Sequence, residues 1–148
     1  MLRITLLCVG RMKEKYFAEA LREYGKRLRR YCAFELTELQ ERGGAEKEGA
    51  ELLARIPAGA YVVALCVEGR ALSSTELASL LGEKSLAGVS RLCFIVGGSE
   101  GLSDAVKERA DLRLSMSEMT FPHHLARVML AEQIYRAFTI LGGAKYHK

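Results

Sequence analysis

Two stretches of the chain combine residues that could hold a small ligand. VGGSEGLS (residues 96–103) is rich in glycine, and SMSEMTFPHH (residues 115–124) sets large apolar side chains among hydroxyls and ends on two histidines. Glycine lets a backbone turn sharply and approach a ligand closely. Met116, Met119 and Phe121 could cover a flat ring such as adenine, while the neighbouring hydroxyls read its edge. Taken singly, the glycines fit a plain strand-to-helix turn equally well, and each apolar side chain fits a cap on the core.

Several common kinds of site are not indicated. The glycine stretch is not GxGxxG and lacks the Lys-Ser/Thr pair of a P-loop, so it predicts neither a dinucleotide nor a triphosphate site. His123 and His124 have no third ligand nearby in sequence, which makes a poor metal site. Pro122 suits the first turn of a helix. The partial positive charge of that helix end could favour a carboxylate, a phosphate or an anionic base.

The last seven residues, GGAKYHK, add a tyrosine, a histidine and two lysines. Composition favours a basic tail that frays, as chain ends commonly do. The alternative is that Tyr146 and His147 fold over the ligand site and Lys148 meets a phosphate.

The chain as a whole alternates strand-like and helix-like segments, which predicts a single α/β domain over residues 1–148. This alternation favours a mostly parallel sheet with helices on both faces. Ligands in such sheets lie beyond the carboxyl ends of the strands. Three such ends stand out, at residues 65–68, 96–101 and 115–121. The expected strands are residues 3–10, 34–40, 60–67, 91–98 and 112–115. The first and last expected helices are residues 14–31 and 122–141. Of the three helices between them, one ends before Pro57, one is opened by a capping box of Ser73 and Glu76, and one is capped by Ser103.

Composition is that of an ordinary globular protein, with 49% apolar and 27% charged residues among 148. No apolar run has the length of a membrane span, and the start of the chain reads as a strand rather than a signal peptide. The four cysteines are widely spaced, so buried free thiols in a reducing cytoplasm are expected. A net charge of +4 permits an anionic partner such as RNA without requiring one.

Two helices carry surfaces that could meet partners. The basic face of residues 14–31 is either a solvated helix face or a contact for RNA phosphates. Its residues are Lys15, Arg22, Lys26 and Arg29. The last helix has a main apolar face and, in its first two turns, apolar residues on the opposite side as well, which predicts a homodimer. The main face holds Leu130, Ile134, Ala137, Phe138 and Leu141, and the opposite side holds Leu125, Val128 and Met129.

The motifs GGxEG, TxPH and EQIYRA, together with the terminal YHK, resemble those of the ribosomal RNA large subunit methyltransferase H family, which are SPOUT-class enzymes. The resemblance covers the whole chain, from LLCVG to YHK. It implies a homodimeric α/β fold with a C-terminal trefoil knot, in the bacterial cytoplasm. It also implies methylation of N3 of a pseudouridine in 23S ribosomal RNA, on assembled ribosomes. The methyl donor would be S-adenosylmethionine, with S-adenosylhomocysteine as product and no metal.

Carried over by position, the donor-binding residues of this family fall on the three strand ends. They are Leu65, Gly97, Met116, Ser117, Glu118, Met119, Thr120 and Phe121. Glu118 would face either solvent or the cationic donor. Because the N3 imide is a poor nucleophile, a base or a cation should assist it. The candidates are His147, Tyr146 and His123, with Arg127, Arg136 and Lys148 as cations that could also contact RNA.

We favour His147 as the base, because a tail in a dimer could reach the partner's donor. Two further readings stay open. One is another SPOUT methyltransferase that acts on transfer RNA or on a ribose hydroxyl. The other is a ribosome-binding protein without catalytic activity.

Overall fold

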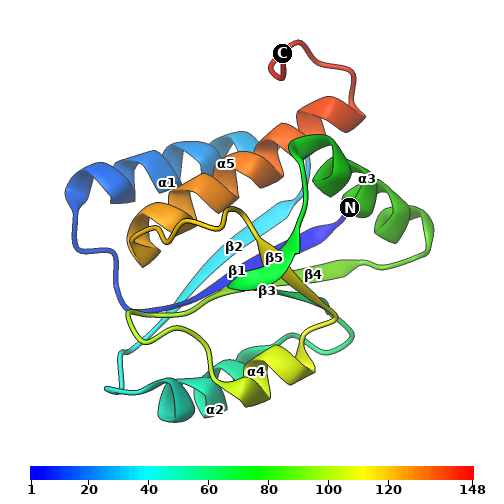
Figure 1. Ribbon diagram of the computed structural model, residues 1–148. Coiled ribbons are helices and arrows are strands. Elements are labelled where there is room, and N and C mark those ends of the chain that lie inside the picture. Colours follow the sequence, from blue (N-terminus) through cyan, green and yellow to red (C-terminus); the bar gives the residue numbers. More distant parts are fainter.

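The computed structural model describes all residues, Met1–Lys148, as five strands and five helices in strict alternation (Figure 1). Every strand pairing is parallel, in the order β2-β1-β4-β3-β5. This confirms the predicted α/β fold and makes the sheet wholly, rather than mostly, parallel. The elements are β1 (Arg3–Val9), α1 (Lys15–Leu28), β2 (Ala33–Leu39), α2 (Ala45–Arg55), β3 (Tyr61–Ala71), α3 (Ser74–Leu86), β4 (Arg91–Val96), α4 (Asp104–Arg109), β5 (Leu112–Ser115) and α5 (His123–Leu141).

Helices cover both faces of the sheet, which explains why its inner strands are apolar at almost every position. Along β1, Ile4 and Leu6 point to the face covered by α1, α3 and α5, while Leu7 and Val9 point to the face covered by α2 and α4 (Figure 1). On α5, Ile134 is buried as the helical period predicted. Leu141 is an exception to the predicted stripe, because it lies in the last turn and is 49% exposed.

The predicted helix caps at two places are confirmed. Ser73 and Glu76 form a full capping box at the start of α3. The side chain of Ser103 accepts a hydrogen bond from the backbone N–H of Val106 at 3.3 Å, at the start of α4. Pro122 lies one residue before α5 rather than in its first turn. All four cysteines are free thiols and are buried, as expected. None of the five helices combines the length and the apolar character that a membrane span requires.

Strand β3 departs from the expected range and builds one wall of the site. The sequence predicted an end at residue 67, but pairing resumes further on, since both Leu65 and Arg70 lie opposite Leu114 of β5. The residues between them leave the ladder as a bulge. A Cβ at Gly69 would stand 2.7 Å from the carbonyl oxygen of Arg113, so only glycine allows this close return.

Candidate active site

A cavity of about 620 Å³ lies where the ends of β3, β4 and β5 meet. This is the carboxyl edge of the parallel sheet, and the three strand ends are those singled out from the sequence. Its volume is within the range of small-molecule sites, about 300–1,000 Å³. Its wall is mostly made of apolar side chains and glycine backbone, including Leu65, Cys66, Val96, Gly97, Leu102, Met116, Met119 and Phe121.

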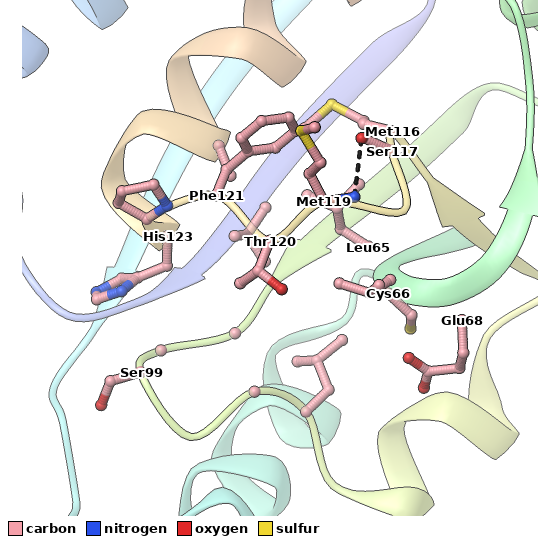
Figure 2. A pocket seen from close by; sticks show the side chains of 18 of the residues that line it. Leu65, Cys66, Glu68, Ser99, Met116, Ser117, Met119, Thr120, Phe121 and His123 are labelled. Atoms are coloured by element: carbon pink, nitrogen blue, oxygen red, sulfur yellow. Dashed lines mark hydrogen bonds between the residues drawn. The ribbon is translucent and has the colours of Figure 1, made fainter.

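The loop after β5 forms the upper wall of this cavity (Figure 2). Ser115 donates a hydrogen bond to the carbonyl of Ser117 at 3.0 Å, and the hydroxyl of Ser117 accepts one from the backbone N–H of Met119 at 3.0 Å. The two hydroxyls thus shape the loop itself. Figure 2 shows the thioethers of Met116 and Met119 beside the ring of Phe121. The side chain of Met119 is 74% exposed, which leaves apolar surface at the cavity free to cover a ligand.

Of the eight residues predicted to bind the donor, seven line the cavity: Leu65, Gly97, Met116, Ser117, Met119, Thr120 and Phe121. Glu118 is the eighth, and it is exposed and outside the lining. Its carboxylate therefore faces solvent, which answers the question that the sequence left open. The hydroxyl of Thr120 points toward the space between the loops (Figure 2).

The glycine-rich turn after β4 is closed too tightly for side chains. Gly98 and Gly101 form an isolated bridge, and the N–H of Gly101 donates to the carbonyl of Gly98 at 3.0 Å. A Cβ at Gly97 would stand 2.6 Å from the carbonyl oxygen of Gly101. Gly101 itself has a φ of +75°, which side chains rarely adopt. The turn therefore needs glycine for its own geometry and, in consequence, presents bare backbone to the cavity.

An ion pair that the sequence reasoning missed lies on the cavity wall. Glu68, on the β3 bulge, contacts Lys107 of α4 at 2.5 Å, and both line the cavity. The hydrogen bond from Lys107 lowers the pKa of Glu68, and the same contact raises the pKa of Lys107. Nothing in the sequence signals this pair, because its members are joined only by the fold.

The two adjacent histidines have different surroundings. His123 lines the cavity at the end opposite Glu68 (Figure 2), and its buried Nε2 has no hydrogen-bond partner. Burial is the main cause that lowers its pKa, followed by the nearby His124 and Arg127, so the imidazole is neutral at neutral pH. His124 is instead bound through Nδ1 to Glu14 at 2.9 Å, which ties α5 to the start of α1.

The prediction that Arg127 supports catalysis or meets RNA is wrong. Its side chain is completely buried and donates to Glu38 at 2.7 Å and to the carbonyls of Val9 and Gly10 at 2.6 and 2.7 Å. A guanidinium held by three acceptors inside the protein cannot contact a phosphate outside it. Arg127 fastens the end of β1 to α5.

The C-terminal tail folds back on its own helix, away from the cavity. Tyr146 donates to Glu132 at 2.7 Å, and Arg136 lies 3.1 Å from Nδ1 of His147. Arg136 is roughly 20 Å along α5 from its first residue, at a rise of 1.5 Å per residue, and the tail lies at the far end of the helix in Figure 1. Tyr146 and His147 therefore do not line the cavity of their own chain.

The cationic residues predicted to meet RNA divide into two groups. Arg136 is committed to Glu132, at 2.7 Å, and to the tail. By contrast, the predicted basic face of α1 is wholly on the surface, and Lys148 is exposed as well. The exposed members are Lys15, Arg22, Lys26, Arg29 and Lys148.

The residues of the cavity fit S-adenosylmethionine. The apolar wall suits an adenine ring, and bare glycine backbone leaves peptide groups for its edge. A Cβ at Gly97 would stand 2.6 Å from the carbonyl oxygen of Gly101, so the glycine side of the cavity stays bare for a ligand. No group of three or more His, Cys, Asp or Glu side chains could hold a metal ion.

Sequence comparison identifies the class of protein to which this fold and cavity belong. The family described as "Predicted SPOUT methyltransferase" matches residues 2–147, so the chain belongs to the SPOUT methyltransferase family. This confirms the resemblance stated from the motifs.

Full-length relatives narrow the class further. The ribosomal RNA large subunit methyltransferase H of Clostridioides difficile (strain 630) is 45% identical over 159 residues, covering 99% of this chain and 100% of that protein. The protein of the same name from Bacillus pumilus (strain SAFR-032) is 43% identical, with the same coverage.

Solved structures agree on the fold. A probable methyltransferase from Bordetella pertussis Tohama I has a TM-score of 0.59 at 11% identity, covering 93% of this chain and 96% of that one. The SpoU methyltransferase AviRb from Streptomyces viridochromogenes, solved in complex with AdoMet, has a TM-score of 0.50 at 11% identity, covering 95% of this chain and 58% of that one.

Proposed function

We propose that this protein is a ribosomal RNA methyltransferase that uses S-adenosylmethionine to methylate N3 of a pseudouridine in 23S ribosomal RNA, within assembled ribosomes of the bacterial cytoplasm. The observation that carries the proposal is the cavity at the three strand ends. Seven of the eight residues that match the donor-binding positions of the family meet there. Full-length relatives at 43–45% identity bear the name of a large-subunit ribosomal RNA methyltransferase.

The cavity residues have distinct tasks in this proposal. Leu65, Met116 and Phe121 hold the adenine, and the glycine turn contributes backbone groups. The donor supplies a methyl group on a sulfonium, and N3, once its proton has passed to water, forms the bond to that methyl carbon as the carbon–sulfur bond breaks and its electron pair stays on sulfur. The protein must hold the nucleotide in line with this bond, which is a task of positioning.

A homodimer would complete the site. The cavity of one chain holds no residue of its own tail, whereas Tyr146, His147 and Lys148 are gathered at the other end of α5. The predicted contact surface on α5, Leu125, Val128 and Met129, is only partly buried within the chain. Pairing through this surface would bring the tail of one chain to the cavity of the other. A trefoil knot formed by the donor loops belongs to the same proposal, on the resemblance to the family.

Recognition of RNA falls to the surface rather than to the cavity. The exposed basic face of α1 offers phosphate contacts, and two copies in a dimer would double it. Because these contacts lie on one short helix, we expect weak affinity for free RNA. The assembled ribosome would supply the remaining contacts.

The test is transfer of labelled methyl from S-adenosylmethionine to ribosomes that lack this modification, with free 23S RNA and transfer RNA alongside. Label at a pseudouridine on assembled ribosomes alone is the expected result. Label on transfer RNA would keep the class of enzyme and replace the substrate. Donor binding without label on any of the three would contradict the proposed activity.

A further inference from the structure

The tail is held by a small network of charged and polar side chains on α5. The carboxylate of Glu132 accepts hydrogen bonds from Arg136 and from Tyr146, both at 2.7 Å. The guanidinium of Arg136 lies over the ring of Tyr146, with 4.8 Å between its central carbon and the ring centroid. Arg136 then extends its Nη1 to within 3.1 Å of Nδ1 of His147. Both Tyr146 and His147 are thereby fixed by one arginine.

The network is braced by a second helix. Gln133 donates to Glu132 at 2.9 Å and accepts from the hydroxyl of Ser74 at 2.6 Å. Ser74 is the first residue of α3, so the tail is connected through three side chains to the element that follows β3. A tail held this way has a defined orientation rather than that of a frayed end, which overturns the expectation from composition.

The contact between Arg136 and His147 fixes which ring nitrogen carries the proton. A guanidinium has only N–H donors and no acceptor. Nδ1 of His147 must therefore accept the hydrogen bond with its lone pair. In a neutral imidazole one nitrogen is the acceptor and the other is the N–H donor. The proton of His147 is consequently on Nε2.

We propose that Arg136 is a positioning residue that holds His147 as its Nε2–H tautomer, so that His147 donates a hydrogen bond to the target nucleotide instead of removing its proton. This rests on the proposed function, and it replaces the interpretation of His147 as a base. A neutral imidazole whose Nδ1 is already bonded and whose Nε2 already holds a proton has no free lone pair with which to accept another.

A donor at this place suits the reaction. When N3 loses its proton to water, the negative charge spreads onto the two carbonyl oxygens beside it. An N–H aimed at one of these oxygens stabilises the anion and keeps it oriented, as an oxyanion-hole donor does. Tyr146 does not supply a second donor, because its single O–H is already given to Glu132 at 2.7 Å, so this side chain braces the tail.

The tautomer can be measured without any substrate. With only three histidines in the chain, long-range ¹H–¹⁵N spectra of histidine-labelled protein resolve each ring, and the His147→Gln variant assigns the signal. We expect the Nε2–H form in the wild type and in Arg136→Lys, which keeps a donor to Nδ1. Arg136→Met should move His147 toward a mixture of tautomers. An Nδ1–H form in the wild type, or no change in Arg136→Met, would overturn the proposal.

Methyl transfer provides the second measurement, on whichever RNA accepts label. His147→Gln keeps an N–H near the position of Nε2 and should remain within about tenfold of the wild-type kcat, whereas His147→Ala should lose about 10²–10³-fold, the usual effect of losing one oxyanion-hole donor. Lys145→Gln, at an exposed neighbour in the tail, is the control. Equal losses in the Gln and Ala variants would identify a base and contradict the proposal. The spectra stay interpretable even if the ribosomal substrate is wrong.

Discussion

The two ends of α5 each place an arginine beside a histidine, and the two arginines serve opposite purposes. Arg127, near the cavity, is fully buried and meets the carboxylate of Glu38 and two backbone carbonyls at the end of β1. Arg136, near the tail, is 25% exposed and meets only side chains. What a guanidinium touches therefore decides its role. Carbonyls of a central strand make it part of the scaffold, whereas side chains of a terminal segment make it a support for groups that can leave their own chain.

The histidines differ in the same way. His123 is at the cavity, where burial lowers its pKa and leaves its Nε2 without a hydrogen-bond partner. His147, at the tail, has its Nδ1 taken by Arg136. One end of α5 thus lies at the cavity for a small molecule, and the other end holds the imidazole of His147 in a fixed orientation. A dimer that joins unlike ends would bring the two together.

The largest expected effect is on folding, from Arg127→Met. Removing this side chain takes the donor from the carbonyls of Val9 and Gly10 and breaks the ion pair with Glu38. Breaking a buried ion pair commonly costs about 3–5 kcal/mol of the free energy of unfolding. Urea denaturation at fixed protein concentration measures it. Arg136→Met is the matched control at the other end of the helix, and an equal loss there would erase the distinction between the two arginines.

The next effect is on the cavity itself, from Gly97→Ala. The added Cβ would stand 2.6 Å from the carbonyl oxygen of Gly101, so the turn must open. A displacement of about 1 Å in a site can reduce the rate of reaction about 100-fold. Methyl transfer and calorimetric binding of S-adenosylmethionine should both weaken while the fold persists. Gly44→Ala, where φ is 174° and nothing lies within 4 Å, should leave both unchanged. A fully active Gly97→Ala would show that the turn does not hold the donor.

Much of the cavity end could be predicted from the sequence because its signals are local. The apolar runs of β3 and β4 mark strands covered on both faces, and parallel strands gather their carboxyl ends at one edge. The glycines and the apolar loop then fall on that edge without further information. The caps at Ser73 and Ser103 are equally local, since each is decided within one turn of helix.

The parts that sequence reasoning missed depend on partners far apart in the chain. The acceptors of Arg127 lie 89 to 118 residues away from it. The ion pair of Glu68 and Lys107 likewise joins two separate elements, the bulge of β3 and α4. One available signal was overlooked, however. Leu130 and Ile134 follow Arg127 at i+3 and i+7, so helical spacing alone places this arginine on the buried face.

Complementation between chains tests whether the two ends of α5 act across a dimer. Mixing Gly97→Ala with His147→Ala subunits should form some dimers in which one site has both lesions and the other has none. Methyl transfer should then rise above that of either variant alone, by a margin that grows with the share of mixed dimers. Absence of any recovery, with mixed dimers demonstrated by native mass spectrometry, would assign the whole site to one chain. Sedimentation showing only monomers would remove the dimer altogether.

The smallest expected effect is the pH dependence that His123 gives to stability. Because burial lowers its pKa below the ordinary 6.5, the unfolded chain takes up a proton on this ring at a higher pH than the folded chain does. This difference in proton uptake has no effect on stability above about pH 6.5, and it lowers the free energy of unfolding progressively as the pH falls below that value. Urea midpoints should therefore drop between about pH 7 and about pH 5.5, and His123→Leu should reduce that drop. The hydrogen bond with His124 is the main cause that lowers the pKa of Glu14, so this carboxylate takes up its proton only at lower pH. The loss of the bond between Glu14 and His124 is therefore separated in pH from the effect of His123. An unchanged drop in His123→Leu would mean that the ring is not kept neutral by its burial beside the cavity.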